Sequence, residues 1–315
     1  MSTVLFTHPA GLDHVTPDGH PERVARLRAV TAALADPGFD ALVRREAPPA
    51  EVEELLRCHP QRYVDLIRAA IPAEGSRALD ADTHVSPGSW DAALAGLGQV
   101  LAALDAVMAG QADNAFAAIR PPGHHAETEK PMGFCLFGSV AIAAKRALDH
   151  HGLKRVAVVD FDVHHGNGTQ DLLWDEPRVL FASSQQMPLW PGTGAVTERG
   201  AHDNVINMPL PPGANGGQFR AMWEEHAFPR LKAFAPELVL ISAGFDAHIA
   251  DPLAQLALEV ADFTWITQRL CDLADAHAGG RVVSALEGGY DLGALAESVA
   301  AHVQVLMERG RRDGR

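Results

Sequence analysis

Four short apolar segments of this chain each run directly into a stretch rich in Gly, Asp, His and Glu. They cover residues 115–119, 155–159, 238–243 and 281–286. Each is typical of a buried strand of a parallel sheet, and such sheets bind their ligands where the strands end. Glycines after each segment permit tight turns and close approach of the backbone. Solvated surface is a poor explanation for four loops of this kind, so we expect them to meet at one functional site.

Helical patterns alternate with these strand patterns. In residues 89–109 the leucines keep helical spacing, with Ser89 as a candidate N-cap and Gly110 as a candidate C-cap. The expected strands are 2–7, 114–119, 155–161, 178–182, 203–208, 237–242 and 281–286. The expected helices are 21–35, 60–70, 89–109, 137–150, 216–234, 258–277 and 293–308. Such alternation predicts an α/β fold whose parallel sheet is covered by helices on both faces.

No internal repeat or low-complexity linker divides the 315 residues. Because the polar stretches must converge from one sheet, we expect a single domain over residues 1–315, although this length also accommodates two domains. Three segments rich in Gly, Pro, Asp and Ser are expected to be loops: 7–20, 71–87 and 183–204. Long loops within a compact domain are usually either functional or disordered.

The composition argues against several classes of protein. A formal net charge of −14 does not suit non-specific binding to nucleic acid. Cys58, Cys135 and Cys271 form no C-x-x-C pair, which fits a reducing compartment. The first eight residues are typical of a strand rather than a signal peptide, and we expect no apolar run long enough to span a bilayer. We expect a cytoplasmic protein that binds neither nucleic acid nor membrane; a homo-oligomer is among the states left open.

Asp162 and His164 follow the segment 155–159 and stand two residues apart. On extended backbone their side chains point the same way. An oxygen and a nitrogen ligand that face one direction form half of a metal site. The spacing alone fits a capping Asp and a solvated His equally well. Asp246, which follows another apolar segment in a similar way, favours the metal interpretation.

The tandem pair His124–His125 follows a strand and the turn Pro121-Pro122-Gly123. Such a pair in an exposed turn would ordinarily face solvent. Beside a metal site it suits acid–base chemistry, because imidazole titrates in the range needed both to accept a proton and to return it.

These motifs together resemble the histone deacetylase superfamily, which also contains acetylpolyamine amidohydrolases and acetoin-utilisation proteins. The resemblance rests on stretches that stand in the family's order: GHPER, RPPGHHAE, MGFC, DFDVHHGNGTQ, SAGFDAH and EGGYD. Position 167 is Asn, whereas class I deacetylases have Asp there. In this respect the chain resembles the class II-like branch with its many bacterial members. The resemblance implies an arginase-like three-layer α/β/α sandwich with a mostly parallel sheet.

The resemblance also implies the bound ions. Asp162, His164 and Asp246 match three zinc ligands, with one zinc ion per chain and an open fourth position. The two carboxylates make the site harder than a typical zinc site, so Fe²⁺ and Co²⁺ are alternatives. A structural potassium ion is implied by the positions that match its ligands: Asp160, Asp162, His164, Ser183 and Ser184. Gln185 departs from the family, in which many relatives have His.

By the same resemblance, His125 is the general base and acid, oriented by Asn167. His124 is its partner, oriented by Asp160. Because a neutral Asn cannot stabilise an imidazolium as Asp can, the division of roles between the two histidines stays open. Tyr290 matches the family's catalytic tyrosine, which donates to the oxyanion.

The implied substrate site is a tunnel. Phe134, beside Gly133, and Trp190 match paired aromatic walls that grip an aliphatic chain. Asp82 matches a rim position that binds the substrate backbone. Leu253 stands where polyamine-selective relatives place an acidic residue.

We therefore expect a zinc-dependent amidohydrolase that removes an acyl group, acetyl above all, from a substrate similar to acyl-lysine. One alternative is an acetylpolyamine amidohydrolase or another small-amide hydrolase, for which Asp18 or Glu22 of the first loop would supply the acid. Another is a binding protein on a deacetylase scaffold without chemistry, which the presence of every ligand and of Tyr290 disfavours.

Overall fold

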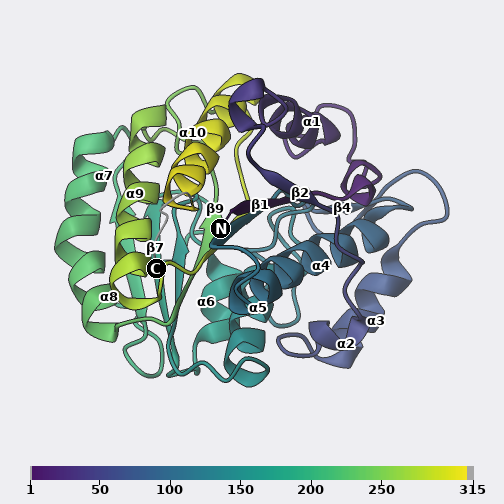
Figure 1. The fold of residues 1–315 in the computed structure, drawn as a ribbon. Helices are drawn as coiled ribbons and strands as arrows, with labels where there is room; N and C mark the ends of the chain where they lie inside the picture. Colours follow the sequence, from purple (N-terminus) through teal and green to yellow (C-terminus); the bar gives the residue numbers. More distant parts are fainter. Residues whose placement is uncertain (1, 311–315) are drawn as a thin grey trace.

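A parallel sheet of eight strands organises the structure, a computed structural model that describes residues 2–310 (Figure 1). In spatial order the strands are β2 (Val43–Arg45), β1 (Thr3–Phe6), β5 (Asn114–Ala117), β10 (Val282–Leu286), β9 (Leu238–Ala243), β6 (Val156–Asp160), β7 (Val179–Gln186) and β8 (Val205–Leu210). Every neighbouring pair runs parallel, which confirms the expected sheet. A short antiparallel pair lies apart from it: β3 (Arg77–Ala78) and β4 (His84–Val85).

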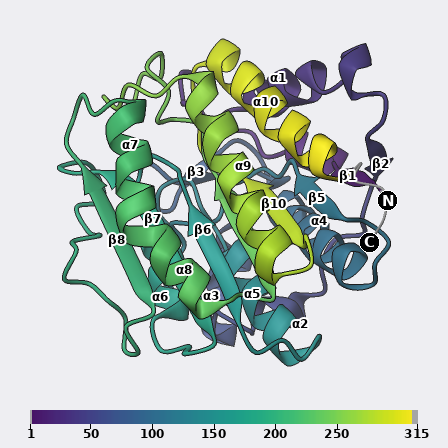
Figure 2. The ribbon, with the colours of Figure 1, turned by 60° about the vertical axis from the view of Figure 1, so that its left-hand side comes forward.

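Helices cover both faces of the sheet, which gives the expected three layers. One face packs against α1 (Val24–Ala33), α7 (Gly216–Met222), the π-helical turn η3 (Trp223–Ala227), α8 (Phe228–Phe234), α9 (Val260–His277) and α10 (Leu292–Gly310). Figure 2 shows α7 to α10 lying in front of the strands. The other face packs against α2 (Val52–Leu55), α3 (Gln61–Ala70), α4 (Ser89–Met108), α5 (Ser139–Asp149) and α6 (Asn167–Leu173). The short 3-10 turns η1 (Pro9–Leu12) and η2 (Pro37–Phe39) complete the elements.

Successive residues of each central strand enter opposite cores. In β6, Ala157 and Val159 pack with α9 and α10, whereas Val156 and Val158 pack with α4 and α5. Both sets are buried, so the strand needs apolar residues at every position rather than at alternate ones. This is why the central strands are recognisable in the sequence as continuous apolar runs.

The structure departs from the expected elements where local patterns are weak. β7 continues to Gln186, four residues beyond its expected end, because its polar residues are buried by neighbouring elements. The helix expected over 216–234 is interrupted by the π-helical turn η3. Gly88, not Ser89, is the N-cap of α4; Ser89 is the first helical residue, and its Oγ accepts a hydrogen bond from the Ser86 N–H at 2.7 Å.

One expectation about membranes needs correction. By length and composition α4 is apolar enough to cross a bilayer, although the sequence suggested no such segment. In the fold, 78% of its apolar window is buried, as in the core helix of a globular domain.

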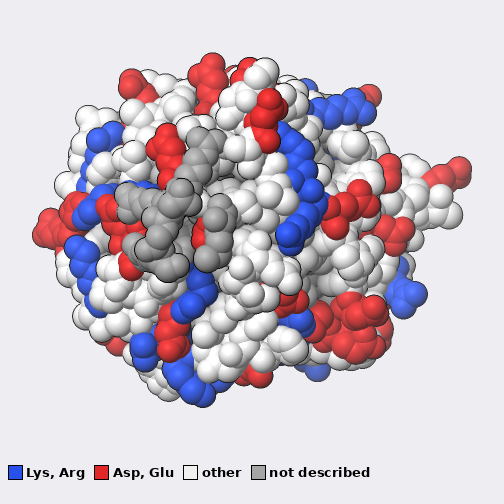
Figure 3. All heavy atoms as spheres, viewed as in Figure 1, with Lys and Arg blue, Asp and Glu red and all other residues white. Residues whose placement is uncertain are grey.

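Charge is mixed on the face of the molecule seen in Figure 3. Lys and Arg side chains gather in short groups that alternate with Asp and Glu, and acidic side chains gather over α2 and α3 at the lower right. The three cysteines are all buried and form no disulfide.

A buried ion-pair network ties the first loop to the sheet. Glu22 is fully buried and accepts hydrogen bonds from Arg120 at 2.9 Å and from Arg26 at 3.1 Å. His14 Nε2 lies 3.5 Å from the same carboxylate. Although burial opposes ionisation, the charge of Arg120 holds the pKa of Glu22 well below its usual range. Glu22 is therefore committed to the interior and cannot serve as an acid at a substrate entrance.

We expect Glu22→Gln to lower the free energy of unfolding at neutral pH by about 3–5 kcal/mol, because it leaves two buried guanidinium groups without their counter-charge. Urea unfolding measures this, with Glu74→Gln in an exposed loop as the control. Since the folded-state pKa is depressed, the carboxylate stabilises the fold above its ordinary pKa of about 4.3 and loses this effect as the pH falls below that value. The difference between wild type and variant should shrink over the same range; equal stability at pH 7 would contradict the role of Glu22.

Candidate active site

The four polar stretches follow β5, β10, β9 and β6, which are the four adjacent strands at the centre of the sheet. Because these strands are parallel, their carboxyl ends lie along one edge, and the residues beyond them meet there. The expected convergence is thus a direct result of strand order.

Asp162, His164 and Asp246 form a compact buried cluster at this edge. Their ligand atoms all lie within 4.8 Å of one another. His164 Nδ1 is 3.2 Å from Asp162 Oδ1 and 3.1 Å from Asp246 Oδ2. Backbone N–H groups fix both carboxylates: Gly288 donates to Asp162, and Val163 donates to Asp246, each at 2.9 Å.

The electrostatics of this cluster favour a bound cation. Burial raises the pKa of Asp246 to about 7, and the charge of Asp162 adds to the shift. Burial acts against the charge on His164, but hydrogen bonds that its ring donates to the two carboxylates raise the pKa of that imidazole to about 10. The two buried carboxylates thus share the single positive charge that the His164 imidazole can carry. A divalent metal ion would supply that charge, and the oxygen and nitrogen donors suit zinc-like transition metals.

Gly288 makes this close packing possible. A Cβ atom at this position would lie 2.2 Å from Asp246 Oδ2 and 2.5 Å from Asp162 Oδ2. Any side chain here would therefore displace two of the three candidate ligands. Gly288 in the EGGYD stretch must therefore be a glycine, because its backbone passes close to the two carboxylates.

The tandem histidines lie beside the cluster, and each bonds to a different partner. His124 Nδ1 is 2.9 Å from Asp160 Oδ2, and His125 Nδ1 is 2.8 Å from Asn167 Oδ1. The Asn167 amide is fixed because its Nδ2 donates to Glu127 Oε1 at 2.7 Å. Asn167 Oδ1 must then accept from His125, so a neutral His125 carries its proton on Nδ1 and presents a bare Nε2.

The two imidazoles also differ in protonation. Burial opposes charge on His124, but the nearby carboxylates of Asp162 and Asp160 raise its pKa well above the usual value. Burial lowers the pKa of His125 well below the usual value, and the charge of His124 adds to this effect. The pair therefore offers one imidazolium and one neutral imidazole.

Tyr290 lies between the cluster and a cavity. Its backbone N–H donates to Asp251 at 2.7 Å, and its ring packs edge-on against Phe134 at 5.8 Å. The Arg26 guanidinium lies 5.0 Å from the ring centroid and donates to the carbonyls of Gly289 and Glu287. Burial raises the pKa of the phenol well above its usual value, so it stays a hydrogen-bond donor.

A cavity of about 350 Å³ opens next to His125, His164 and Tyr290. All five residues expected to bind substrate line it: Asp82, Gly133, Phe134, Trp190 and Leu253. His20, Pro21, Ala81, His84 and Leu189 complete the lining. Six of the thirteen lining residues come from the three long loops, which therefore help to shape the entrance.

Gly133 and Phe134 both have positive φ, at 55° and 69°. A Cβ atom on Gly133 would lie 2.4 Å from His125 and 2.5 Å from Trp190. The Gly133 N–H donates to Asp82 at 3.2 Å, which fixes this turn against the rim. Burial and the neighbouring Asp80 raise the pKa of Asp82.

Several supporting residues were not singled out from the sequence, although most lie within the motifs. Glu287 accepts from Gly123 N–H at 2.7 Å and from Ser242 Oγ at 3.1 Å, and so joins the histidine turn to two strands. Burial raises its pKa to about 7. Asp251 bonds to the backbone of Tyr290 and Leu253. These roles become visible only when the strands are placed side by side.

Ser183 and Ser184, two of the positions expected to bind potassium, lie in β7. Ser183 Oγ donates to Gln185 Oε1 at 3.0 Å, and Ser184 Oγ is buried without a hydrogen-bond partner among the described residues. His248 Nδ1 accepts from the Ala250 N–H at 3.1 Å, so that histidine stabilises a turn and does not line the cavity.

Comparisons with known proteins agree with this geometry. The model of the histone deacetylase domain matches residues 20–306. A histone deacetylase-like amidohydrolase of Pseudomonas aeruginosa is 40% identical over 277 residues, which cover 86% of this chain and 73% of that protein. The human polyamine deacetylase HDAC10 is 38% identical over 92% of this chain and 45% of its own length.

Among solved structures, the HDA15 HD domain superposes with a TM-score of 0.92 at 34% identity. The match covers 98% of this chain and 88% of that one. With a family model that spans most of the sequence and relatives of this similarity, the chain belongs to the histone deacetylase family.

Proposed function

We propose that this protein is a zinc-dependent amidohydrolase that removes an acetyl or related acyl group from an amine nitrogen of a substrate similar to acyl-lysine. The observation that carries the proposal is the buried cluster of Asp162, His164 and Asp246 at the base of an aromatic cavity, beside His125 and Tyr290. Family membership supports a deacetylase or amidohydrolase activity in general terms.

Asp162, His164 and Asp246 would hold one zinc ion, with Fe²⁺ or Co²⁺ as alternatives. When bound, such an ion supplies a Lewis acid that polarises the amide carbonyl and makes water more acidic. The fit rests on two buried carboxylates, Asp162 and Asp246, whose combined negative charge exceeds what the third donor, His164, can offset.

His125 would accept the proton of the attacking water on Nε2, because its Nδ1 proton is engaged with Asn167. It would then deliver that proton to the leaving amine. His124 remains an imidazolium beside Asp160 and stabilises negative charge that develops nearby. The pairing of His125 with a neutral Asn favours this division, because Asn does not stabilise a second imidazolium.

Tyr290 would donate its phenolic hydrogen bond to the carbonyl oxygen as that atom gains negative charge. Asp251 and Arg26 fix the turn that carries it, from the backbone side. Phe134 and Trp190 would enclose the aliphatic stem of the substrate, and Asp82 would hold the substrate backbone at the rim.

The substrate class rests on the entrance. Leu253 lines the cavity and offers no charge to a second ammonium, and Glu22 is buried in its own ion-pair network. A distal ammonium near Leu253 would therefore lose hydration without gaining a partner there. Similarity to a human polyamine deacetylase keeps an acetylpolyamine substrate as the second candidate, for which Asp18 is the remaining acid of the two considered in the sequence.

We also propose a structural potassium ion beneath the cluster, held by Asp160, Asp162, His164, Ser183 and Ser184 together with backbone carbonyls. The buried Ser184 Oγ, which has no partner among the described residues, supports this proposal. Such a cation would offset the repulsion between neighbouring buried carboxylates.

Asp246→Ala should lower zinc affinity more than about 100-fold, because even partners that only orient a ligand are worth 10–100-fold. Zinc content by atomic absorption and turnover of an acetyl-lysine peptide should fall together. The exposed Asp65→Ala is the control. Stoichiometric zinc with normal turnover in Asp246→Ala would reject the ligand assignment.

Tyr290→Phe should lower kcat by about 10²–10³-fold while zinc content and KM stay close to wild type, since the change removes one donor to the oxyanion. Tyr63→Phe is a matched control, because Tyr63 is the chain's other tyrosine and its hydroxyl donates to the Leu136 carbonyl, away from the cavity. A Tyr290→Phe enzyme that turns over like wild type would exclude the phenol from the reaction.

The substrate test compares kcat/KM for an acetyl-lysine peptide, acetylspermidine and acetylputrescine. We expect the peptide to be preferred by wild type. Leu253→Glu should shift the ratio towards acetylpolyamines by about tenfold or more through a charge-assisted pair, whereas the uncharged Leu253→Gln should not. A wild-type preference for an acetylpolyamine would overturn the acyl-lysine assignment in favour of the second candidate.

A further inference from the structure

The two tandem histidines differ in the group that faces their Nδ1 atoms. His124 Nδ1 lies 2.9 Å from a carboxylate oxygen of Asp160, whereas His125 Nδ1 lies 2.8 Å from the side-chain amide of Asn167. A carboxylate offers only acceptors. An amide offers an oxygen on one side and an NH₂ group of similar size on the other, so Asn167 by itself can present either atom to His125. A group beyond Asn167 must therefore decide which atom faces the histidine.

The surroundings of Asn167 Nδ2 identify that group. The nitrogen donates to Glu127 Oε1 at 2.7 Å, and its other neighbours are Met132 Sδ at 3.3 Å and the His125 carbonyl at 3.5 Å. All three are acceptors. The thioether is a weak acceptor, and 3.5 Å is long for a hydrogen bond to a carbonyl. The carboxylate of Glu127 is the strongest of the three, so it determines the orientation of the amide.

The opposite orientation of the amide would change the tautomer of His125. Asn167 Oδ1 would then face the carboxylate of Glu127, and Nδ2 would face His125 Nδ1. Because Nδ1 would have to accept a hydrogen bond, a neutral ring would carry its proton on Nε2 and would no longer present a bare nitrogen there. In serine proteases, a histidine held in the wrong tautomer lowers kcat by about 10⁴-fold.

The backbone holds Glu127 beside Asn167 without help from the Glu127 carboxylate. The Glu127 N–H donates to the Lys130 carbonyl at 3.0 Å. The N–H and the hydroxyl of Thr128 both donate to Asp171 Oδ2, at 2.8 and 2.6 Å. Asp171 belongs to α6, whose first residue is Asn167. A substitution of the Glu127 side chain therefore leaves the turn attached to the helix.

We propose that Glu127 is a positioning residue for His125. Its carboxylate fixes the Asn167 amide, and the amide in turn holds the His125 proton on Nδ1. Glu127 does not line the catalytic cavity, so it acts only through Asn167. This role rests on the proposed function, in which His125 accepts the proton of water. It gives the neutral Asn167 a defined orientation that it does not possess alone.

The substitution Glu127→Lys tests this proposal, because it replaces a group that only accepts by one that only donates. Asn167 should turn its oxygen towards the ammonium and its NH₂ group towards His125. We expect kcat for an acetyl-lysine peptide to fall at least about tenfold, while KM and zinc content stay close to wild type. Glu129→Lys is the matched control: it makes the same change of charge two residues away, at an exposed glutamate paired with Arg62.

A second substitution separates this role from a general loss of structure. In the Glu127→Lys background, Asn167→Asp supplies a carboxylate that can accept from both the ammonium and His125 Nδ1. It should therefore raise kcat of that variant by about tenfold. In the wild-type background the same substitution places two carboxylates side by side and should lower kcat. Failure of Asn167→Asp to restore activity to Glu127→Lys would overturn the proposal.

The tautomer of His125 can also be observed without turnover. Nuclear magnetic resonance of the zinc-loaded protein with isotope-labelled histidine shows which ring nitrogen carries the proton, and the signals lost in His125→Ala identify this residue. We expect the proton on Nδ1 in wild type, on Nε2 in Glu127→Lys, and on Nδ1 again after Asn167→Asp is added. An unchanged tautomer in Glu127→Lys would reject the role of Glu127. Because this readout needs no substrate, it decides that role separately from the amidohydrolase assignment.

Discussion

The burial of Asp162 and Asp246 against a single imidazole is the constraint on which the rest of the structure depends. An ionised carboxylate without hydration is stable only with compensating donors or charge. The donors here are the backbone N–H groups of Gly288 and Val163 and the ring of His164. These donors follow β6 and β10, and Asp246 follows β9 between them, so strand order and register are themselves conditions for forming the cluster.

The same constraint explains why support for the site extends to the first loop. The turn after β10 carries both Gly288 and Tyr290, and Arg26 holds that turn by its carbonyls. Arg26 is buried, so it needs Glu22, which in turn bonds to Arg120 at the end of β5. A chain of buried charges therefore fixes the position of the phenol without touching the cavity from within.

The central strands and the residues after them were predictable because burial on both faces leaves continuous apolar runs that end in polar motifs. Elements that form only because of contacts with residues distant in the sequence were not predictable. The polar end of β7 is a strand because neighbours bury it, and the π-helical turn at 223–227 leaves no mark in the apolar pattern. Glu22 resembled a surface acid in the sequence, and only the fold shows that Arg120 and Arg26 surround it. The hydrogen bond from Asn167 to Glu127 depends on an amide orientation that no sequence pattern specifies.

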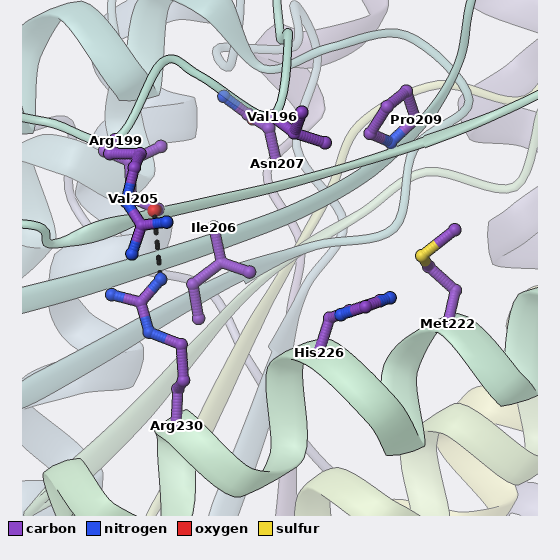
Figure 4. A pocket seen from close by; sticks show the side chains of 9 residues that line it. All are labelled: Val196, Arg199, Val205, Ile206, Asn207, Pro209, Met222, His226 and Arg230. Atoms are coloured by element: carbon purple, nitrogen blue, oxygen red, sulfur yellow. Dashed lines mark hydrogen bonds between the residues drawn. The ribbon is translucent and has the colours of Figure 1, made fainter.

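The base of the site tolerates fewer substitutions than its entrance. At the base, a Cβ atom on Gly288 would meet two carboxylates, so almost any change there disturbs the cluster. At the entrance, Trp190 is 40% exposed and Leu253 is only half-buried, so both belong to loops that tolerate new side chains. The loop after β7 presents Trp190 to the cavity and Val196 to a separate pocket against β8 (Figure 4). The side chains of this loop are therefore constrained by two different surroundings. Changes at the entrance can alter which substrate fits without disturbing the cluster at the base of the site.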